Sequence, residues 1–187
     1  MIYKKPVSVL VVIHTIALEV LLLERARHPG FWQSVTGSQE DAEPLLETAR
    51  REVCEETGIA AAQNDFIDWQ MSNRYEIFAE WRHRYAPGIT HNTEHVFSLC
   101  LPRKSTVTIA PDEHLSYRWL PWREAADACF SWTNRDAILE LPRRLGGCVA
   151  HQLGSILSAV RQAAGGDPGF HHGSLATDIE KNPHGRS

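Results

Sequence analysis

The sequence lacks several features that would direct it to particular classes of protein. No apolar run approaches the roughly 20 residues that a membrane-spanning helix requires, so a role within a membrane is not expected. The formal net charge is -4, with 23 acidic against 19 basic residues, so no overall positive field draws the chain onto nucleic acid or anionic lipid. Any anionic substrate must therefore be bound by a local basic site.

Cysteine is scarce and scattered. The sequence contains four cysteines with no CxxC pair, Cys54, Cys100, Cys129 and Cys148. This spacing does not resemble a small disulfide framework, so we expect reduced thiols and a cytoplasmic location. The basic start of the chain is interrupted by Pro6 and is followed by no small-residue cleavage site, so the apolar residues 7–13 indicate a buried strand and not a signal peptide.

The elements that are present alternate irregularly between strand and helix patterns. With 187 residues, 43% of them hydrophobic and 22% charged, the chain suits one globular domain. We expect strands over residues 7–13, 19–24, 31–36, 66–71, 76–84, 95–101 and 116–120, with late helices over residues 124–130 and 134–141. The first two strands should form a hairpin. Because the order does not repeat as regular strand-helix units, we predict an α/β fold with a mixed β-sheet flanked by helices.

The character of the chain changes after Arg144. Gly146 and Gly147 break the pattern, so we place the end of the catalytic domain, residues 1–147, at this point. Residues 148–164 should form an extra C-terminal helix, and residues 165–187 should form a flexible tail. The sequence does not indicate an oligomeric state.

One helix concentrates the acidic residues. Proline suits the first position of a helix, and glycine suits the left-handed residue that ends one, so the pattern predicts a helix from Pro44 to Thr57 with Gly58 as its cap. On a helical wheel Leu46, Ala49 and Val53 share a face that packs on the sheet. The rest of the helix is strongly charged.

The acidic residues of this helix fall into two groups. Glu52 and Glu56 lie at the edge of the buried face, whereas Glu47, Arg51 and Glu55 lie on the polar side. A solvated face explains Glu47, which we expect to form an ordinary i,i+4 pair with Arg51. It does not explain Glu52, Glu55 and Glu56, because these like charges repel and lie where the helix dipole disfavours them. A hard divalent cation shared with substrate phosphates would compensate them, and it could activate an attacking water.

These residues complete a named pattern. Gly37, five residues, Glu43, seven residues, and then Arg51 to Ile59 as Arg-Glu-Val-Cys-Glu-Glu-Thr-Gly-Ile form the full Nudix box, and the sequence resembles the Nudix hydrolase family. The resemblance implies an α/β/α sandwich and Mg²⁺ dependence, with Mn²⁺ as a possible substitute. It also implies metal ligands and catalytic groups at Glu52 and Glu56, with Glu55 assisting. Arg51 would orient the carboxylates through Glu43, and Gly37 would let the backbone approach the metal.

The box does not select a substrate, so the flanking residues must do so. Segments within residues 3–8, 31–38, 82–88, 92–94, 113–115 and 131–135 resemble the branch of the family that acts on dihydroneopterin triphosphate in folate biosynthesis. This resemblance implies cleavage between the α and β phosphates. It implies Glu113 as a further metal ligand or base, and substrate-binding residues at Lys4, Arg25, Thr36, Tyr75, Glu76, Ile77, Phe78 and Ser131.

The residues alone leave alternatives open at several of these positions. Lys4 and Arg25 could neutralise phosphate or be ordinary surface cations, and a loop carboxylate such as Glu113 is a weak signal by itself. Tyr75 and the tryptophans could stack on a flat ring or fill the core. His83 and His114 are more often structural hydrogen-bonding residues than catalysts.

Two other functions compete with hydrolysis of a pterin triphosphate. A Nudix enzyme that clears dATP or oxidised nucleoside triphosphates would share the helix, the metal and the pyrophosphate product. A non-catalytic nucleotide sensor of the same fold would usually lack box carboxylates, whereas Glu52, Glu55 and Glu56 are all present. The expected ligand is thus a small-molecule pterin or nucleoside triphosphate.

Overall fold

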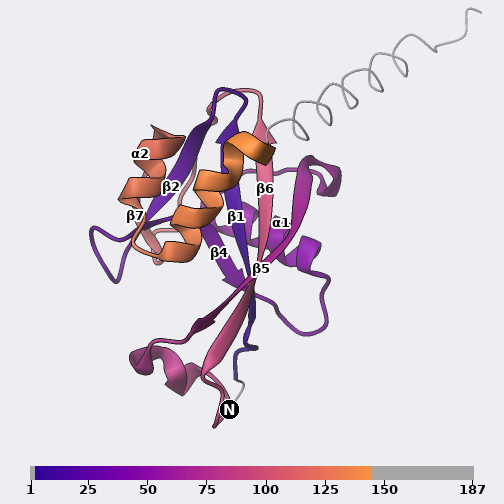
Figure 1. Ribbon diagram of the computed structural model, residues 1–187, viewed down its shortest axis with the longest axis vertical. Helices are drawn as coiled ribbons and strands as arrows, with labels where there is room; N and C mark the ends of the chain where they lie inside the picture. The colour runs from indigo at the N-terminus through magenta and orange to yellow at the C-terminus, as the bar shows by residue number, and fades with distance from the viewer. Residues whose placement is uncertain (1–2, 145–187) are drawn as a thin grey trace, which may run out of the picture.

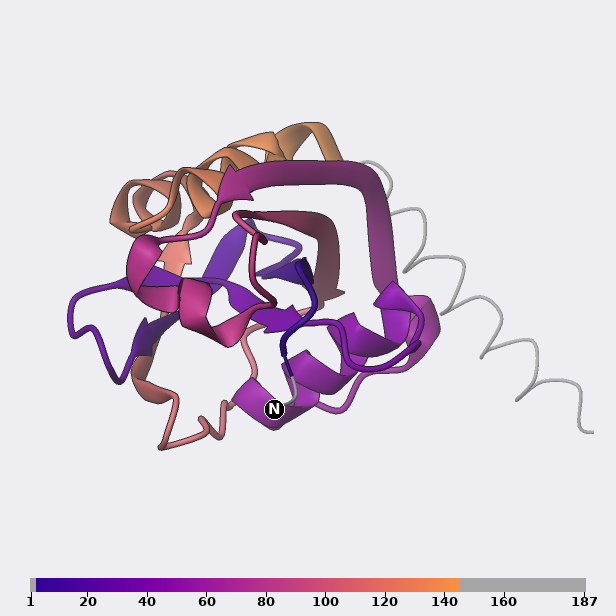
Figure 2. The same cartoon turned by 90° about the horizontal axis from the view of Figure 1, so that it is seen from below.

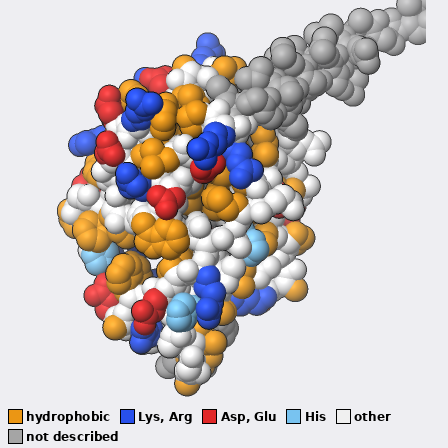
Figure 3. All heavy atoms as spheres, viewed as in Figure 1, with side chains coloured by type: hydrophobic (Ala, Val, Ile, Leu, Met, Phe, Trp, Pro, Cys, Tyr) orange, Lys and Arg blue, Asp and Glu red, His pale blue; other side chains and the backbone are white. Residues whose placement is uncertain are grey.

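The computed structural model of the protein describes residues 3–144 (Figure 1). The predicted C-terminal helix (148–164), the predicted tail (165–187) and the predicted domain boundary at residue 147 lie outside the described residues. Within residues 3–144, no helix combines the length and apolar character needed to cross a membrane. On the face shown in Figure 3, acidic and basic side chains are interspersed without an extended field of one sign.

Seven strands form one mixed sheet. They are β1 (Val7–Thr15), β2 (Glu19–Arg25), β3 (Trp32–Gln33), β4 (Val35–Ser38), β5 (Phe66–Glu76), β6 (His91–Leu101) and β7 (His114–Pro121). The order β3-β2-β1-β6-β5 is extended by β4, which pairs with β1, and by β7, which pairs with β2. β1 and β6 are parallel, while the other pairs are antiparallel, including the expected hairpin of β1 and β2.

Helices cover both faces of this sheet, as Figure 2 shows. One face of β1 and β2 packs against α1 (Leu45–Thr57), and that core includes Val9, Val11, Ile13, Leu21, Leu23, Ala49 and Val53. The opposite face packs against α2 (Trp122–Ala128) and a helix over residues 132–144, and that core includes Leu10, Val12, Val20, Leu22, Ala125, Ala126 and Ile138. Burial on both faces explains why the first strand is apolar almost throughout. The α/β/α sandwich with a mixed sheet is confirmed.

One expected strand is wrong. Residues 76–84 do not continue as a strand, because β5 ends at Glu76 opposite His91, and residues 79–84 form a 3-10 helix, η2 (Ala79–Arg84). The Ile77 N–H still donates to the Thr90 carbonyl at 2.8 Å, but no neighbouring strand is available after that point. The expected strand over residues 31–36 is instead divided into β3 and β4. A second short 3-10 helix, η1 (Gln63–Asp65), precedes β5.

The limits of α1 agree closely with the sequence pattern. Pro44 is the N-cap rather than the first helical residue, so the helix begins one residue later than expected. Gly58 has a left-handed φ of 69°, and its N–H donates to the Cys54 carbonyl at 2.9 Å. The helix therefore ends at Thr57, as predicted.

The cysteines differ in part from expectation. Cys54 and Cys129 are free thiols. Cys100 is disulfide-bonded, so the expectation of reduced thiols is wrong for this residue.

Candidate active site

A cavity of about 960 Å³ lies where β1 and β6 begin and where β2 and β5 end. Most of its lining residues belong to four groups. They are residues of β4 and α1, the cations Lys4, Arg25, Arg27 and Arg84, some residues of β5, η2 and β6 between positions 75 and 94, and residues within 112–114 and 130–134. The chain thus brings segments that are far apart in sequence around one hollow. Thirteen of the predicted site residues line it: Lys4, Arg25, Thr36, Gly37, Arg51, Glu52, Glu55, Glu56, Tyr75, Glu76, Phe78, Glu113 and Ser131.

The carboxylates of α1 differ sharply in exposure. Glu56 is only 2% exposed, and the Glu52 side chain is 13% exposed, while the Glu55 side chain is 57% exposed. Burial, followed by repulsion from Glu56, raises the pKa of Glu52 to about 7. Burial also raises the pKa of Glu56, although hydrogen bonds from His114 and from the Thr36 backbone oppose that shift. The placement of Glu52 and Glu56 against the buried edge is therefore as the wheel predicted.

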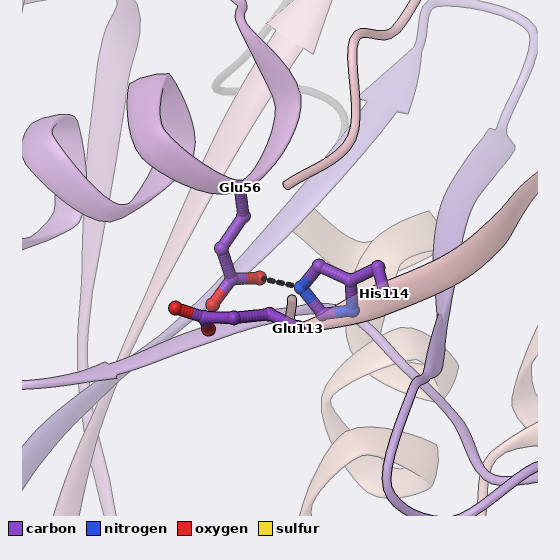
Figure 4. Close-up of side chains that lie close together, drawn as sticks. All are labelled: Glu56, Glu113 and His114. Atoms are coloured by element: carbon purple, nitrogen blue, oxygen red, sulfur yellow. Dashed lines mark hydrogen bonds and ion pairs between the residues drawn. The ribbon is translucent and has the colours of Figure 1, made fainter. Parts of the chain in front are cut away.

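A second carboxylate and a histidine approach Glu56 from the start of β7. Figure 4 shows Glu113 beside Glu56, with the His114 ring on the other side. His114 Nε2 lies 3.0 Å from Glu56 Oε2, and both side chains are 3% exposed. One potential ligand atom from each of Glu56, Glu113 and His114 lies within 4.8 Å of the others. Because Nε2 is hydrogen-bonded to the carboxylate, we assign His114 to orienting Glu56.

Gly37 lies directly against the Glu52 side chain. A Cβ atom at this position would lie 1.8 Å from Glu52 Cδ and 2.0 Å from Glu52 Oε1. Because Gly37 has no side chain, the Glu52 carboxylate of α1 can pack directly against β4. The expectation that the Gly37 backbone approaches a metal stays a prediction.

Arg51 is the centre of an ion-pair network. Its guanidinium contacts Glu43 Oε1 at 2.8 Å, Glu52 Oε1 at 2.9 Å and Glu55 Oε2 at 3.1 Å, and it donates to the Ser38 carbonyl at 3.1 Å. The hydrogen bond from Arg51 lowers the pKa of Glu43 to about 2. Arg51 thus fixes one oxygen of Glu52, which leaves the other available to a ligand.

The expected pair between Glu47 and Arg51 is wrong. Glu47 instead forms an ion pair with Arg50, three residues later in the helix, at 3.0 Å. Arg51 points toward the carboxylates because Glu43, Glu52 and Glu55 together offer it a stronger negative environment than Glu47 alone.

The two predicted phosphate-binding cations differ in exposure, since Lys4 is exposed and Arg25 is partly buried. The backbone N–H of Lys4 donates to the Arg84 carbonyl at 2.9 Å, and the backbone of Lys4 forms a single parallel β-bridge with Tyr85. Partial desolvation beside the cavity, followed by repulsion from Arg84, lowers the pKa of Lys4, and desolvation by burial lowers the pKa of Arg25. A bound anion would reverse both effects.

Arg25 is also held in a fixed direction. Its Nη1 donates to Gln33 Oε1 at 2.8 Å, and its guanidinium lies 5.4 Å from the centre of the Trp81 ring. Gln33 in turn donates to the Thr36 hydroxyl at 3.2 Å. Arg25 and Thr36 are therefore linked through one glutamine at the cavity wall.

The remaining predicted substrate-binding residues are placed unequally. Tyr75 and Phe78 line the cavity, and so does Glu76, which forms an ion pair with Arg82. Ser131 also lines it and accepts a hydrogen bond from Asn134 Nδ2 at 2.8 Å. Ile77 is 3% exposed and does not line the cavity, so its side chain packs in the interior instead of facing a ligand.

Several cavity residues were not predicted as site residues: His114, Arg84, Asn92 and Glu94. His114 directly follows the proposed ligand Glu113, and its bond to Glu56 fits the structural hydrogen-bonding role that the sequence favoured for it. Asn92 and Glu94 belong to a segment already noted for its resemblance, but the alternation of β6 was needed to place both side chains on the cavity wall.

The carboxylates fit a hard divalent cation. Glu52 and Glu56 are buried with raised pKa values, and Glu113 adds a third carboxylate to the same hollow. Carboxylate oxygens are the ligands that Mg²⁺ and similar ions prefer. The chain therefore presents an acidic cluster that could hold a divalent metal ion.

Together the fold and this site define the class. The sequence pattern of the NUDIX domain matches residues 4–141, and this chain belongs to the Nudix family of hydrolases. Dihydroneopterin triphosphate diphosphatase of Escherichia coli (strain K12) is 49% identical over 140 residues, which cover 73% of this chain and 92% of that protein. The enzyme of the same name from Haemophilus influenzae is 41% identical over 139 residues, covering 73% and 87% of the two chains.

Solved structures agree with this assignment. The structure of the E. coli dihydroneopterin triphosphate pyrophosphohydrolase matches with a TM-score of 0.68 and 47% identity, covering 74% of this chain and 95% of that one. A Nudix hydrolase structure from Listeria monocytogenes has a TM-score of 0.58 at 24% identity, covering 76% and 96% of the two chains, and it supports the fold alone.

Proposed function

We propose that this protein hydrolyses 7,8-dihydroneopterin triphosphate to dihydroneopterin monophosphate and pyrophosphate, with Mg²⁺ as its metal ion. The observation that carries the proposal is the 49% identity to the E. coli diphosphatase, which extends over 92% of that enzyme and is not confined to the catalytic box. The cavity of about 960 Å³ is also large enough for a bicyclic ring and a triphosphate chain.

The cations and the carboxylates divide the work at the phosphates. Lys4 and Arg25 neutralise phosphate oxygens by charge-assisted hydrogen bonds, and the partial burial of Arg25 strengthens those that it forms. Glu52 and Glu56, with Glu55 and Glu113, hold Mg²⁺, and Arg51 fixes the direction of Glu52. When bound, the metal ion offsets phosphate charge and lowers the pKa of a coordinated water.

In the proposed reaction, one water supplies the new P–O bond at the α or the β phosphorus, and the bond between that phosphorus and the bridging oxygen breaks. Glu113 is exposed and lies next to Glu56, so we assign it the proton of the attacking water or a place among the metal ligands. After attack at α the bridging oxygen leaves with pyrophosphate, and after attack at β it stays with the monophosphate. Hydrolysis in ¹⁸O-labelled water tests this assignment: label in the monophosphate indicates attack at α, and label in pyrophosphate indicates attack at β.

A cytoplasmic location remains part of the proposal, and the free thiols of Cys54 and Cys129 are compatible with it. The disulfide-bonded Cys100 does not support that location.

The substrate is tested by comparing kcat/KM for dihydroneopterin triphosphate, dATP and 8-oxo-dGTP, with pyrophosphate release as the common readout. We expect a clear preference for the pterin triphosphate. A preference for either nucleotide would instead assign the protein to the nucleotide-clearing Nudix enzymes. Binding without turnover of any of the three would identify a sensor, which the intact set of Glu52, Glu55 and Glu56 argues against.

A further inference from the structure

The β6 wall of the cavity carries two buried acceptor atoms without donors. Asn92 is 2% exposed and Glu94 is 3% exposed, and both side chains line the cavity. Within the part of the chain that the structure describes, Asn92 Oδ1 and Glu94 Oε2 have no hydrogen-bond partner. A buried polar atom without a partner costs free energy, so these two atoms indicate a ligand that supplies donors.

The direction of the Asn92 amide is set by its neighbours. Its Nδ2 donates to Ser8 Oγ at 2.7 Å and to the Tyr75 hydroxyl at 3.1 Å. Both donor hydrogens are thereby used, and only the acceptor Oδ1 remains. Because residues two apart on a strand face the same side, Asn92 and Glu94 present their acceptors on one surface.

The chemistry of these acceptors excludes the phosphates as their partner. Phosphate oxygens are acceptors and carry negative charge, so they would be repelled by Glu94. The pyrimidine edge of a dihydropterin has the opposite character, since its N3–H and its 2-amino group are adjacent donors. We propose that Glu94, with Asn92 beside it, binds this 2-amino-4-oxo edge and selects the ring of the substrate. This inference rests on the proposed function and adds the residue that recognises the ring.

Two further features of the cavity suit a flat ring with such an edge. Aromatic side chains line the same hollow, and they are Tyr75, Phe78, Trp81, Tyr85, Phe130 and Trp132. Burial raises the pKa of Glu94 to about 7, with Thr133 and Asn73 opposing the shift. The N3–H and the 2-amino group of the substrate would favour the ionised form of the Glu94 carboxylate and would form charge-assisted hydrogen bonds with it.

The test is the substitution Glu94→Gln, which keeps the shape of the side chain but replaces one acceptor with a donor. We expect KM for dihydroneopterin triphosphate to rise about 10- to 100-fold, since a hydrogen bond to a charged group is lost, while kcat changes little because the ring is remote from the reacting phosphorus. Inhibition by inorganic tripolyphosphate, which has no ring, should stay within about threefold of wild type. Glu94→Asp, which keeps the charge on a shorter stem, should give a smaller rise in KM.

Glu124→Gln is the matched control, because Glu124 is exposed on α2 and outside the cavity. Equal losses of pterin-substrate turnover and tripolyphosphate inhibition in Glu94→Gln would reveal a structural role and overturn the inference. Unchanged KM would overturn it as well. Failure of the proposed function is seen separately, in the wild-type enzyme, as preference for dATP over dihydroneopterin triphosphate.

Discussion

Substituting Gly37 by alanine should damage catalysis while sparing the fold. The added Cβ would lie 1.8 Å from Glu52 Cδ, so the carboxyl carbon must move by about 1.6 Å to reach the 3.4 Å at which ordinary contact begins. Glu52 is a flexible side chain, and its carboxyl end can rotate away without displacing α1. The metal ligand, and not the backbone, therefore absorbs the clash.

The size of the effect follows from this displacement. A misplacement of about 1 Å in a reacting arrangement can cost about 100-fold in rate, so we expect kcat to fall by about that factor and the Mg²⁺ concentration for half-maximal activity to rise. The assay is pyrophosphate release over a range of Mg²⁺ concentrations, together with thermal unfolding of the metal-free protein. We expect the melting temperature of Gly37→Ala to stay close to that of wild type.

A double-mutant cycle makes this reasoning refutable. If Gly37 acts only by giving Glu52 room, Gly37→Ala should add little to the loss already caused by Glu52→Gln. Wild-type activity with normal Mg²⁺ dependence in Gly37→Ala would refute the geometric argument. Fully additive losses would show that Gly37 acts through some other contact.

Three further predictions concern α1. Glu56→Gln should abolish Mg²⁺-dependent pyrophosphate release in a protein with an unchanged circular dichroism spectrum; substantial turnover would remove Glu56 from the mechanism. Arg51→Lys should lower kcat/KM about 10- to 100-fold because lysine cannot replace the fork that contacts Glu43 and Glu52, whereas Arg50→Lys should leave it unchanged; equal effects would contradict the network. Because the pKa of Glu52 is raised from 4.5 to about 7, its ionisation destabilises the metal-free fold as pH rises through that range, so Glu52→Gln should raise the melting temperature more at pH 7.5 than at pH 5. A difference that is constant with pH would count against the shift.

Local patterns in the sequence determined the catalytic helix almost completely. The limits of α1, the cap at Gly58 and the burial of Glu52 and Glu56 follow from short-range periodicity and from the conformational preferences of proline and glycine. The apolar residues of β1 likewise predicted a buried strand. These features depend on residues within a few turns or a few positions of one another.

Other features depended on which strand was available as a neighbour. Residues 79–84 carry a strand-like sequence, yet they form η2 because β6 offers its last partner to Glu76. Helical spacing alone wrongly suggested Glu47 as the partner of Arg51. The family resemblance indicated Glu43, and the structure shows that contact together with one to the Ser38 carbonyl, both of which depend on packing beyond the helix.

The sequence by itself thus determined the family, the catalytic helix and the need for a cation near its carboxylates. Only the tertiary structure decided how those carboxylates are held, because His114 meets Glu56 from 58 positions away and Gly37 makes room for Glu52 across a strand-helix contact. It also placed Asn92 and Glu94 on the cavity wall with acceptors left over. Contacts between distant segments and unsatisfied buried atoms are properties of packing, which no local pattern records.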